Sequence, residues 1–263
     1  MPTISEVSSM EGLSLFTQRS PVLNKAGARL ILAIALLSAP LITSCAPHAT
    51  DKNTHLFILA GQSNMVHLDE LAAFAPHIKT ALPNAQVSIV KHAVSATGIG
   101  RWYRNWPVDI PFVAKGDIYD RTFEHKIKPA LATADFDTVT LVWMQGEWDS
   151  KSCAYANAYE ESLKGLYTQL SNDLDRQDIF FIIGRITDAE IPASRKECWN
   201  IIRDAQESVG TSDGNFRWIN TDDLNGPDNG IHMTEEGYRE LGKRFAVEAL
   251  DLIHQRLQRN HYK

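Results

Sequence analysis

The chain has 263 residues, of which 44% are hydrophobic and 22% charged, and its formal net charge at pH 7 is −6. This length and composition are typical of a soluble protein with one substantial domain and a sizeable core. A net negative charge provides no electrostatic footprint for nucleic acid, so nucleic acid is excluded as an expected partner.

The first 44 residues differ from the rest of the chain. Three basic residues precede an apolar run over residues 30–37, which is short for a transmembrane helix and typical of a secretory signal. One aliphatic and two small residues then precede Cys45, which resembles the cleavage site of bacterial lipoproteins. The resemblance implies lipidation of Cys45 and a lipid anchor in the cell envelope, and Ala46 resembles outer-membrane sorting, facing the periplasm or the exterior. The alternative is an ordinary signal peptide with an incidental cysteine.

We therefore expect a signal peptide over residues 1–44, a polar tether over residues 45–54 and a folded domain over residues 55–263. Two further cysteines, Cys153 and Cys198, lie in that domain. An even pair in an exported protein is compatible with a disulfide bond, provided that their Cα atoms come close together. Neither cysteine has a second ligand at a metal-binding spacing, which makes a metal site the weaker alternative.

The folded domain alternates apolar runs with amphipathic segments. Strands are predicted at residues 56–60, 86–90, 138–144, 179–183 and 216–220. Helices are predicted at residues 69–75, 119–134, 154–174, 193–209 and 234–259, with Thr234 as a cap and Pro129 able to kink or divide the second helix. This alternation, without an internal repeat, predicts one α/β domain on a parallel sheet.

Polar residues follow three of the predicted strands at their carboxyl ends. Gly61-Gln62-Ser63-Asn64 follows the first strand, Gln145-Gly146-Glu147-Trp148-Asp149 the third, and a loop ending in His232 the last. A glycine two positions before a serine suits a sharp strand-to-helix turn that exposes the hydroxyl. Because the carboxyl ends of parallel strands share one sheet edge, these residues can meet. Each of them alone could instead be a turn former, a helix-terminus charge or a surface histidine.

Together these residues predict a serine hydrolase. Ser63 would attack an ester carbonyl, and His232 would accept the serine proton and return it to the leaving alcohol. A nearby carboxylate would orient the imidazole. Candidate donors to the oxyanion are the Ser63 N–H, a backbone N–H between Ser95 and Gly100, and the side-chain amide of Gln145.

The segments AGQSNM, WMQGEWD and DNGIHMTEEGYRELGKRFA resemble the sialate O-acetylesterase-like branch of the SGNH hydrolases, which includes carbohydrate acetylesterases and acetylxylan esterases. The resemblance covers residues 55–257. It implies a flavodoxin-like, three-layer α/β/α fold with about five parallel strands, and hydrolysis of acetyl esters without a metal ion or other cofactor. It assigns Ser63 as the nucleophile, His232 as the base and Gln145 as an oxyanion donor.

Two positions depart from the pattern of these relatives. A carboxylate usually stands three residues before the histidine, but Asn229 occupies that position here and Asp228 precedes it. Some relatives use the glutamate of the QGE motif instead, so we favour Glu147 as the third catalytic residue and keep Asp228 second. The relatives' oxyanion-hole glycine has no secure counterpart, and Gly98 is our choice.

Three residues are expected to bind substrate. Trp102 lies in the segment WYRNW, which predicts either a surface for stacking sugars or packing in a lid or core. Gln62 and Arg185 follow predicted strands. Our leading hypothesis is an exported serine esterase that removes acetyl groups from carbohydrate. The alternatives are an esterase for other esters and, because of Asn229, a non-catalytic carbohydrate-binding envelope protein on the same fold.

Overall fold

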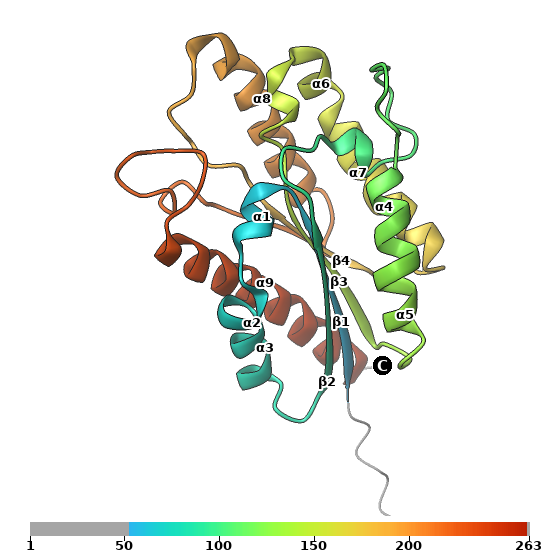
Figure 1. Cartoon of the computed structure of the whole chain (residues 1–263). Helices are drawn as coiled ribbons and strands as arrows, with labels where there is room; N and C mark the ends of the chain where they lie inside the picture. Colours follow the sequence, from blue (N-terminus) through green and yellow to red (C-terminus); the bar gives the residue numbers. More distant parts are fainter. Residues whose placement is uncertain (1–52, 262–263) are drawn as a thin grey trace, which may run out of the picture. The chain divides into compact units, whose positions relative to one another are not determined.

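A five-stranded parallel sheet forms the centre of the domain (Figure 1). In this computed structural model, residues 53–261 are described, so the expected signal peptide and Cys45 lie outside the described range. The strands are β1 (Thr54–Gly61), β2 (Gln86–Ala93), β3 (Thr138–Met144), β4 (Phe180–Gly184) and β5 (Phe216–Ile219), in the spatial order β2-β1-β3-β4-β5. This is the flavodoxin-like order, so the predicted fold is confirmed.

Helices cover both faces of the sheet, and the alternation of β1 shows why. Leu56, Ile58 and Ala60 point into one apolar core, whereas Phe57 and Leu59 point into the other. The first core is covered by α4 (Asp117–Thr122), α5 (Lys128–Leu131), α6 (Cys153–Asn157), α7 (Tyr159–Asp173) and α8 (Ala193–Gly210). The second is covered by α1 (Ser63–His67), α2 (Glu70–Ala73), α3 (Ala75–Ala81) and α9 (Glu235–His261). The result is a three-layer α/β/α sandwich (Figure 1).

The helices differ in detail from the predicted ones. The helix expected over residues 119–134 is divided into α4, a π-helical turn η2 (Phe123–Ile127) and α5. Pro129 is the second residue of α5, which directly follows the π-helical turn, so the division of the helix lies where the proline was expected to cause it. Thr234 caps α9 as predicted, since its Oγ1 accepts a hydrogen bond from the backbone N–H of Gly237 (3.0 Å). Within residues 53–261, no helix combines the length and apolar character needed to cross a bilayer.

The turn after β1 depends on glycine. A Cβ atom on Gly61 would lie 2.0 Å from the carbonyl oxygen of Met144 in β3, so no larger residue fits there. The same carbonyl accepts a hydrogen bond from the N–H of Gln62 (2.9 Å). This close approach turns the chain out of β1 and into α1, which places Ser63 at the carboxyl edge of the sheet.

Candidate active site

Ser63 and His232 meet at this edge although they lie 169 residues apart in the sequence. Ser63 is the first residue of α1 and is 8% exposed. His232 belongs to the loop between β5 and α9, and its Nε2 lies 3.0 Å from the Ser63 hydroxyl oxygen. At this distance the neutral imidazole with its proton on Nδ1 can accept the hydroxyl proton.

His232 has an aromatic neighbour in His67, the last residue of α1. The two rings are in a T-shaped arrangement with their centroids 5.3 Å apart. Desolvation, together with the proximity of His67, lowers the pKa of His232 below its ordinary value of 6.5. His232 is therefore mainly neutral at pH 7, which is the state that a general base requires.

Glu147 was the favoured carboxylate partner of His232, but it does not contact the imidazole. It follows β3, is 4% exposed, and its Oε1 accepts a hydrogen bond from Nδ2 of Asn64 (2.7 Å). Its Oε2 is buried without a partner among the described residues. Burial raises the pKa of Glu147. The prediction that Glu147 orients His232 directly is not what the structure shows, because Asn64 lies at its carboxylate.

The second candidate carboxylate does not reach His232 either. Asp228 is exposed, and neither a hydrogen bond nor an ion pair joins it to His232. The next residue, Asn229, has a left-handed backbone (φ 44°), and its Oδ1 accepts a hydrogen bond from Nδ2 of Asn225 (2.6 Å). The loop therefore turns Asp228 toward solvent. Within residues 53–261, His232 has no carboxylate partner.

Gln145 was expected to be an oxyanion donor, but in the structure its amide nitrogen faces acceptors within the fold. Its side chain is fully buried, and Nε2 lies within hydrogen-bonding distance of Asp149 Oδ2 (2.5 Å), the Thr97 carbonyl (3.0 Å) and Gln62 Oε1 (3.2 Å). An amide nitrogen has only two N–H groups, so none is free for substrate. Burial raises the pKa of Asp149 to about 7, against the lowering effect of the Gln145 hydrogen bond.

A family model described as carbohydrate esterase, sialic acid-specific acetylesterase, matches residues 67–251. The chain belongs to this carbohydrate esterase family. The predicted recognition and the predicted enzyme class, a carboxylic ester hydrolase acting on O-acetyl esters, are thereby confirmed. The matched range includes His232 and begins after Ser63, so the match itself does not assign the nucleophile.

Two solved structures share the fold of this carbohydrate esterase. A protein from Arabidopsis thaliana is 19% identical, with a TM-score of 0.58 over 75% of this chain and 98% of that one. A carbohydrate acetylesterase from Xanthomonas citri is 14% identical, with a TM-score of 0.56 over 76% of this chain and 57% of that one. Among curated proteins, no sequence matches the chain.

The loop that was expected to supply an oxyanion donor lies beside the Ser63 turn. The N–H of Val94 donates to the carbonyl of Gly61 (3.1 Å), and the loop continues into the 3-10 turn η1 (Ile99–Arg101). A Cβ atom on Gly98 would lie 2.4 Å from the Trp148 ring. The backbone N–H of Gly98 donates to no other residue within 53–259. Gly98 thus remains the predicted backbone donor.

Gln62 is only partly available to a substrate of this carbohydrate esterase. It is 4% exposed, and its Oε1 accepts hydrogen bonds from the Gln145 side chain and from the backbone N–H of Trp148 (3.3 Å). Its Nε2 has no partner among the described residues and is not fully buried. Nε2 is therefore the end of the Gln62 side chain that a substrate could reach.

Two residues predicted to bind substrate, Trp102 and Arg185, make contacts inside the fold of this carbohydrate esterase. Trp102 is 1% exposed and packs edge-to-face on Trp143 with ring centroids 5.3 Å apart, so it belongs to the core. Arg185 is held by ion pairs to Glu207 and Asp222 (2.6 Å to the latter), and its guanidinium lies over the Trp218 ring. Both side chains are committed to internal contacts, which leaves no surface for a sugar.

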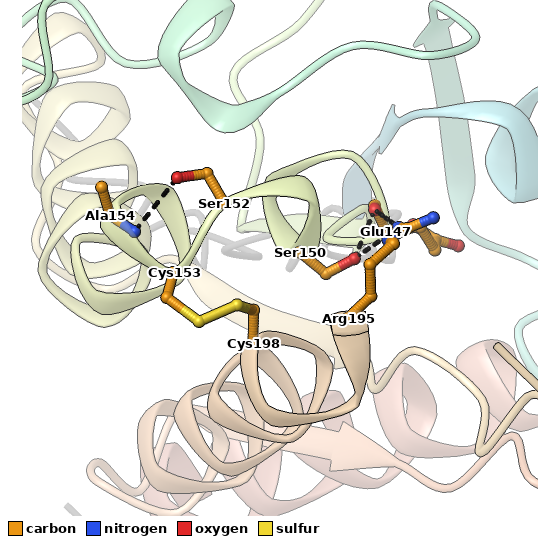
Figure 2. The surroundings of a disulfide bond; sticks show 7 residues. All are labelled: Glu147, Ser150, Ser152, Cys153, Ala154, Arg195 and Cys198. Carbon is orange, nitrogen blue, oxygen red and sulfur yellow. Dashed lines mark hydrogen bonds between the residues drawn. A yellow bond between two sulfur atoms is a disulfide. The ribbon is translucent and has the colours of Figure 1, made fainter. Parts of the chain in front are cut away.

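A disulfide bond lies on the far side of Ser150 and Ser152 from Glu147 (Figure 2). It joins Cys153 of α6 to Cys198 of α8, with their Cα atoms 4.8 Å apart. One helical turn before Cys198, the Arg195 guanidinium donates to the Glu147 carbonyl (2.9 Å) and to the Ser150 hydroxyl (2.6 Å). Helix α8 is thus joined to α6 by the disulfide and to residues 147 and 150 by two hydrogen bonds.

Sequence reasoning missed Asn64, Tyr238 and His67. Asn64 is fully buried, and its Oδ1 accepts a hydrogen bond from the Tyr238 hydroxyl (2.9 Å). The Tyr238 ring lies 5.7 Å from the ring of His67. The one signal for Asn64 was its place directly after Ser63, and for His67 its place one helical turn after Ser63. Nothing in the sequence distinguished Tyr238 from a packing residue of α9.

Proposed function

We propose that this carbohydrate esterase hydrolyses O-acetyl esters of carbohydrate with Ser63 as nucleophile and His232 as general base. The observation that carries the proposal is the 3.0 Å separation of Ser63 Oγ and His232 Nε2 at the carboxyl edge of the sheet. A hydroxyl is a weak nucleophile unless an adjacent base takes its proton. Family membership supplies the ester chemistry that such a pair would perform.

In the first half of the reaction, Ser63 Oγ attacks the acetyl carbonyl carbon while its proton passes to His232 Nε2. The tetrahedral intermediate collapses when the bond to the sugar oxygen breaks, and His232 returns the proton to that oxygen. In the second half, His232 takes a proton from water, and the resulting hydroxide attacks the acetyl-serine. Acetate leaves, and the proton returns to Ser63.

The negative charge on the tetrahedral intermediate needs fixed donors. The N–H of Ser63 is in the first turn of α1, where no intrahelical carbonyl accepts from it. The N–H of Gly98 is the second proposed donor, and Gln62 Nε2 is available beside them. One such donor stabilises the transition state by about 3 kcal/mol.

A small pocket at the Gly98 loop supports an acetyl group as the acyl part. It has a volume of about 70 Å³ and is lined by Thr97, Gly98, Trp106, Val113 and Trp148, among others. The Trp148 N–H donates to Gln62, which directly precedes Ser63. We propose that this pocket takes the acyl methyl group, so that 4-nitrophenyl butyrate is a poorer substrate than 4-nitrophenyl acetate.

The test is acetate release from 4-nitrophenyl acetate, acetylated xylan and an O-acetylated sialic acid. We expect wild-type turnover on at least one carbohydrate ester and a loss of about 10⁴-fold or more in kcat for Ser63→Ala. Turnover of the aryl ester alone would favour a non-carbohydrate substrate. A folded wild type without Ser63-dependent turnover on any of these esters would refute catalysis and favour sugar binding.

We also propose that the domain is exported and held in the cell envelope by a lipid on Cys45. The support is the sequence alone, namely the apolar run over residues 30–37 and the small residues before Cys45. We expect Cys45→Ser to move the protein from the membrane fraction to the soluble fraction of the envelope. Unchanged membrane association of Cys45→Ser would contradict lipidation.

A further inference from the structure

His232 lies on an irregular loop, and within residues 53–261 no carboxylate holds its ring. In a serine hydrolase the third residue of the triad normally orients the imidazole. Some other contact must therefore keep Nε2 at 3.0 Å from Ser63 Oγ. The hydrogen bonds of the residues on either side of His232 identify that contact.

Both neighbours of His232 are held through their backbone. The carbonyl of Ile231 accepts a hydrogen bond from Nδ2 of Asn64 (3.1 Å). The N–H of Met233 donates to the hydroxyl oxygen of Tyr238 (3.3 Å). The peptide segment that carries His232 is thus fixed on its amino side by α1 and on its carboxyl side by α9.

The two anchors are joined to each other. The Tyr238 hydroxyl donates its proton to Oδ1 of Asn64 (2.9 Å) and accepts from Met233, so both of its hydrogen-bonding roles are used. Nδ2 of Asn64 also donates to Oε1 of Glu147 (2.7 Å), so the amide can have only one orientation. Burial raises the pKa of Tyr238 to about 12, so the hydroxyl remains a donor at every pH at which the enzyme would work.

We propose that Tyr238 and Asn64 are positioning residues that hold the His232 loop against the nucleophile, with the buried Glu147 carboxyl orienting Asn64. This inference rests on the proposed function. Asn64 directly follows Ser63 in α1, so one side chain links the nucleophile's own helix to the loop of the base. Glu147 acts on His232 through Asn64 rather than by touching the ring.

Tyr238→Phe tests this assignment, because it removes one hydroxyl and keeps the ring that packs beside His67. We expect kcat for 4-nitrophenyl acetate to fall ten- to a hundredfold, since a small displacement of a catalytic group has effects of this size. We expect KM to stay within twofold, because Tyr238 does not line the acyl pocket. The labelling rate of Ser63 by a fluorophosphonate should fall in parallel with kcat.

Tyr167→Phe is the matched control. The Tyr167 hydroxyl also donates a partly buried hydrogen bond, to the carbonyl of Ile179 (3.3 Å). This bond lies at the amino edge of the sheet, where the Tyr167 ring packs on Phe181 and Phe216. Tyr167→Phe should lose about as much stability as Tyr238→Phe and keep the wild-type kcat. A thermal melt of both variants shows whether either loss of rate comes from unfolding.

The pH dependence gives a readout that a purely structural tyrosine would not move. Partial desolvation and His67 lower the pKa of His232. Glu147 and Tyr238 are linked to its loop by hydrogen bonds, and Asp228 lies on the loop but is exposed. When the loop is released, the ring gains water, so the acid limb of kcat/KM should move upward toward pH 6.5 in Tyr238→Phe. It should not move in Tyr167→Phe.

Equal kcat and an unshifted acid limb in Tyr238→Phe and wild type would overturn the inference. The failure of the proposed function looks different, because Ser63→Ala would then retain turnover or the wild type would have none. In that case the imidazole pKa of His232, measured by NMR, still tests whether Tyr238 holds the loop. An unchanged His232 pKa in Tyr238→Phe would reject the positioning role.

Discussion

The two residues that flank Ser63, Gln62 and Asn64, belong to two separate clusters of hydrogen-bonded buried side chains. Gln62 accepts a hydrogen bond from Gln145, and there both Asp149 carboxylate oxygens and the Gln145 amide nitrogen are used in contacts within the fold. Asn64 leads to Glu147 and Tyr238, where the hydrogen bonds end on the backbone beside the proposed base.

The carboxylates show the difference most clearly. Asp149 accepts hydrogen bonds from the Gln145 side chain (2.5 Å) and from the N–H of Ile99 (3.1 Å), and so fastens the oxyanion loop to the end of β3. Glu147 receives one side-chain donor and has an unpartnered Oε2. The Gln62 cluster thus holds the loop that contains Ile99, and the Asn64 cluster holds the loop that carries His232 and leaves one carboxylate oxygen of Glu147 without a partner among the described residues.

Removing the disulfide is expected to have the largest effect, because it joins α8 to α6, which begins four residues after Asp149 and so follows the loop that both clusters share. The bond closes a segment of 45 residues, and loop-closure entropy predicts a loss of about 4 kcal/mol in the free energy of unfolding for Cys153→Ser with Cys198→Ser. Urea unfolding measures the loss, and reduced wild type should match the double variant. A loss below about 1 kcal/mol would show that α8 holds the loop without the disulfide.

Asp149→Asn is expected to change how the free energy of unfolding depends on pH. The pKa of Asp149 is about 7 in the folded protein, against 3.8 ordinarily, so the folded state binds the proton more tightly. Its contribution to stability is complete below pH 3.8 and is lost as the pH rises through 7, by roughly 4 kcal/mol in total. An asparagine at position 149 does not ionise, so its contribution to stability stays constant over this pH range.

The free energy of unfolding, measured at pH 4 and pH 8, should therefore fall much more in wild type than in Asp149→Asn. The exposed residue Asp135 provides a matched control, and Asp135→Asn should behave like wild type. Parallel pH dependence of Asp149→Asn and wild type would mean that Asp149 keeps its charge in the folded protein.

Glu147→Gln is expected to have the smallest effect of the three changes. It tests whether Glu147 acts through Asn64 or directly on His232. Glutamine keeps an oxygen that can accept from Asn64, so kcat for 4-nitrophenyl acetate should fall less than tenfold. Loss of a carboxylate that directly orients the catalytic histidine costs about 10⁴-fold in kcat. A loss of that size would return Glu147 to the role of third catalytic residue.

The sequence was sufficient to predict the fold and the meeting of Ser63 and His232 at one edge of the sheet. Apolar runs of strand length, each followed by an amphipathic segment, predicted all five strands, and Gly61 before Ser63 indicated the turn that the contact with Met144 requires. These features depend on local spacing and on the rule that parallel strands share one carboxyl edge.

The roles of the supporting side chains could not be predicted in the same manner. Gln145 carries the right functional group for an oxyanion donor, but Asp149 and Thr97 occupy its N–H groups, and that pairing depends on tertiary structure. A tryptophan such as Trp102 suits both an apolar core and a sugar-binding surface. Only the packing of Trp102 on Trp143 in the folded protein shows that it belongs to the core. Spacing identifies which residues share an edge, but it does not show which of their polar atoms are already paired.

The direction of β1 has a consequence for where the enzyme can work. The strand begins at Thr54 on the amino edge of the sheet and ends at Gly61 beside Ser63. Eight residues at about 3.3 Å each separate these edges by roughly 25 Å. The chain therefore enters the domain at the edge opposite Ser63, so a substrate that approaches the Ser63 edge does not meet the point at which the chain enters.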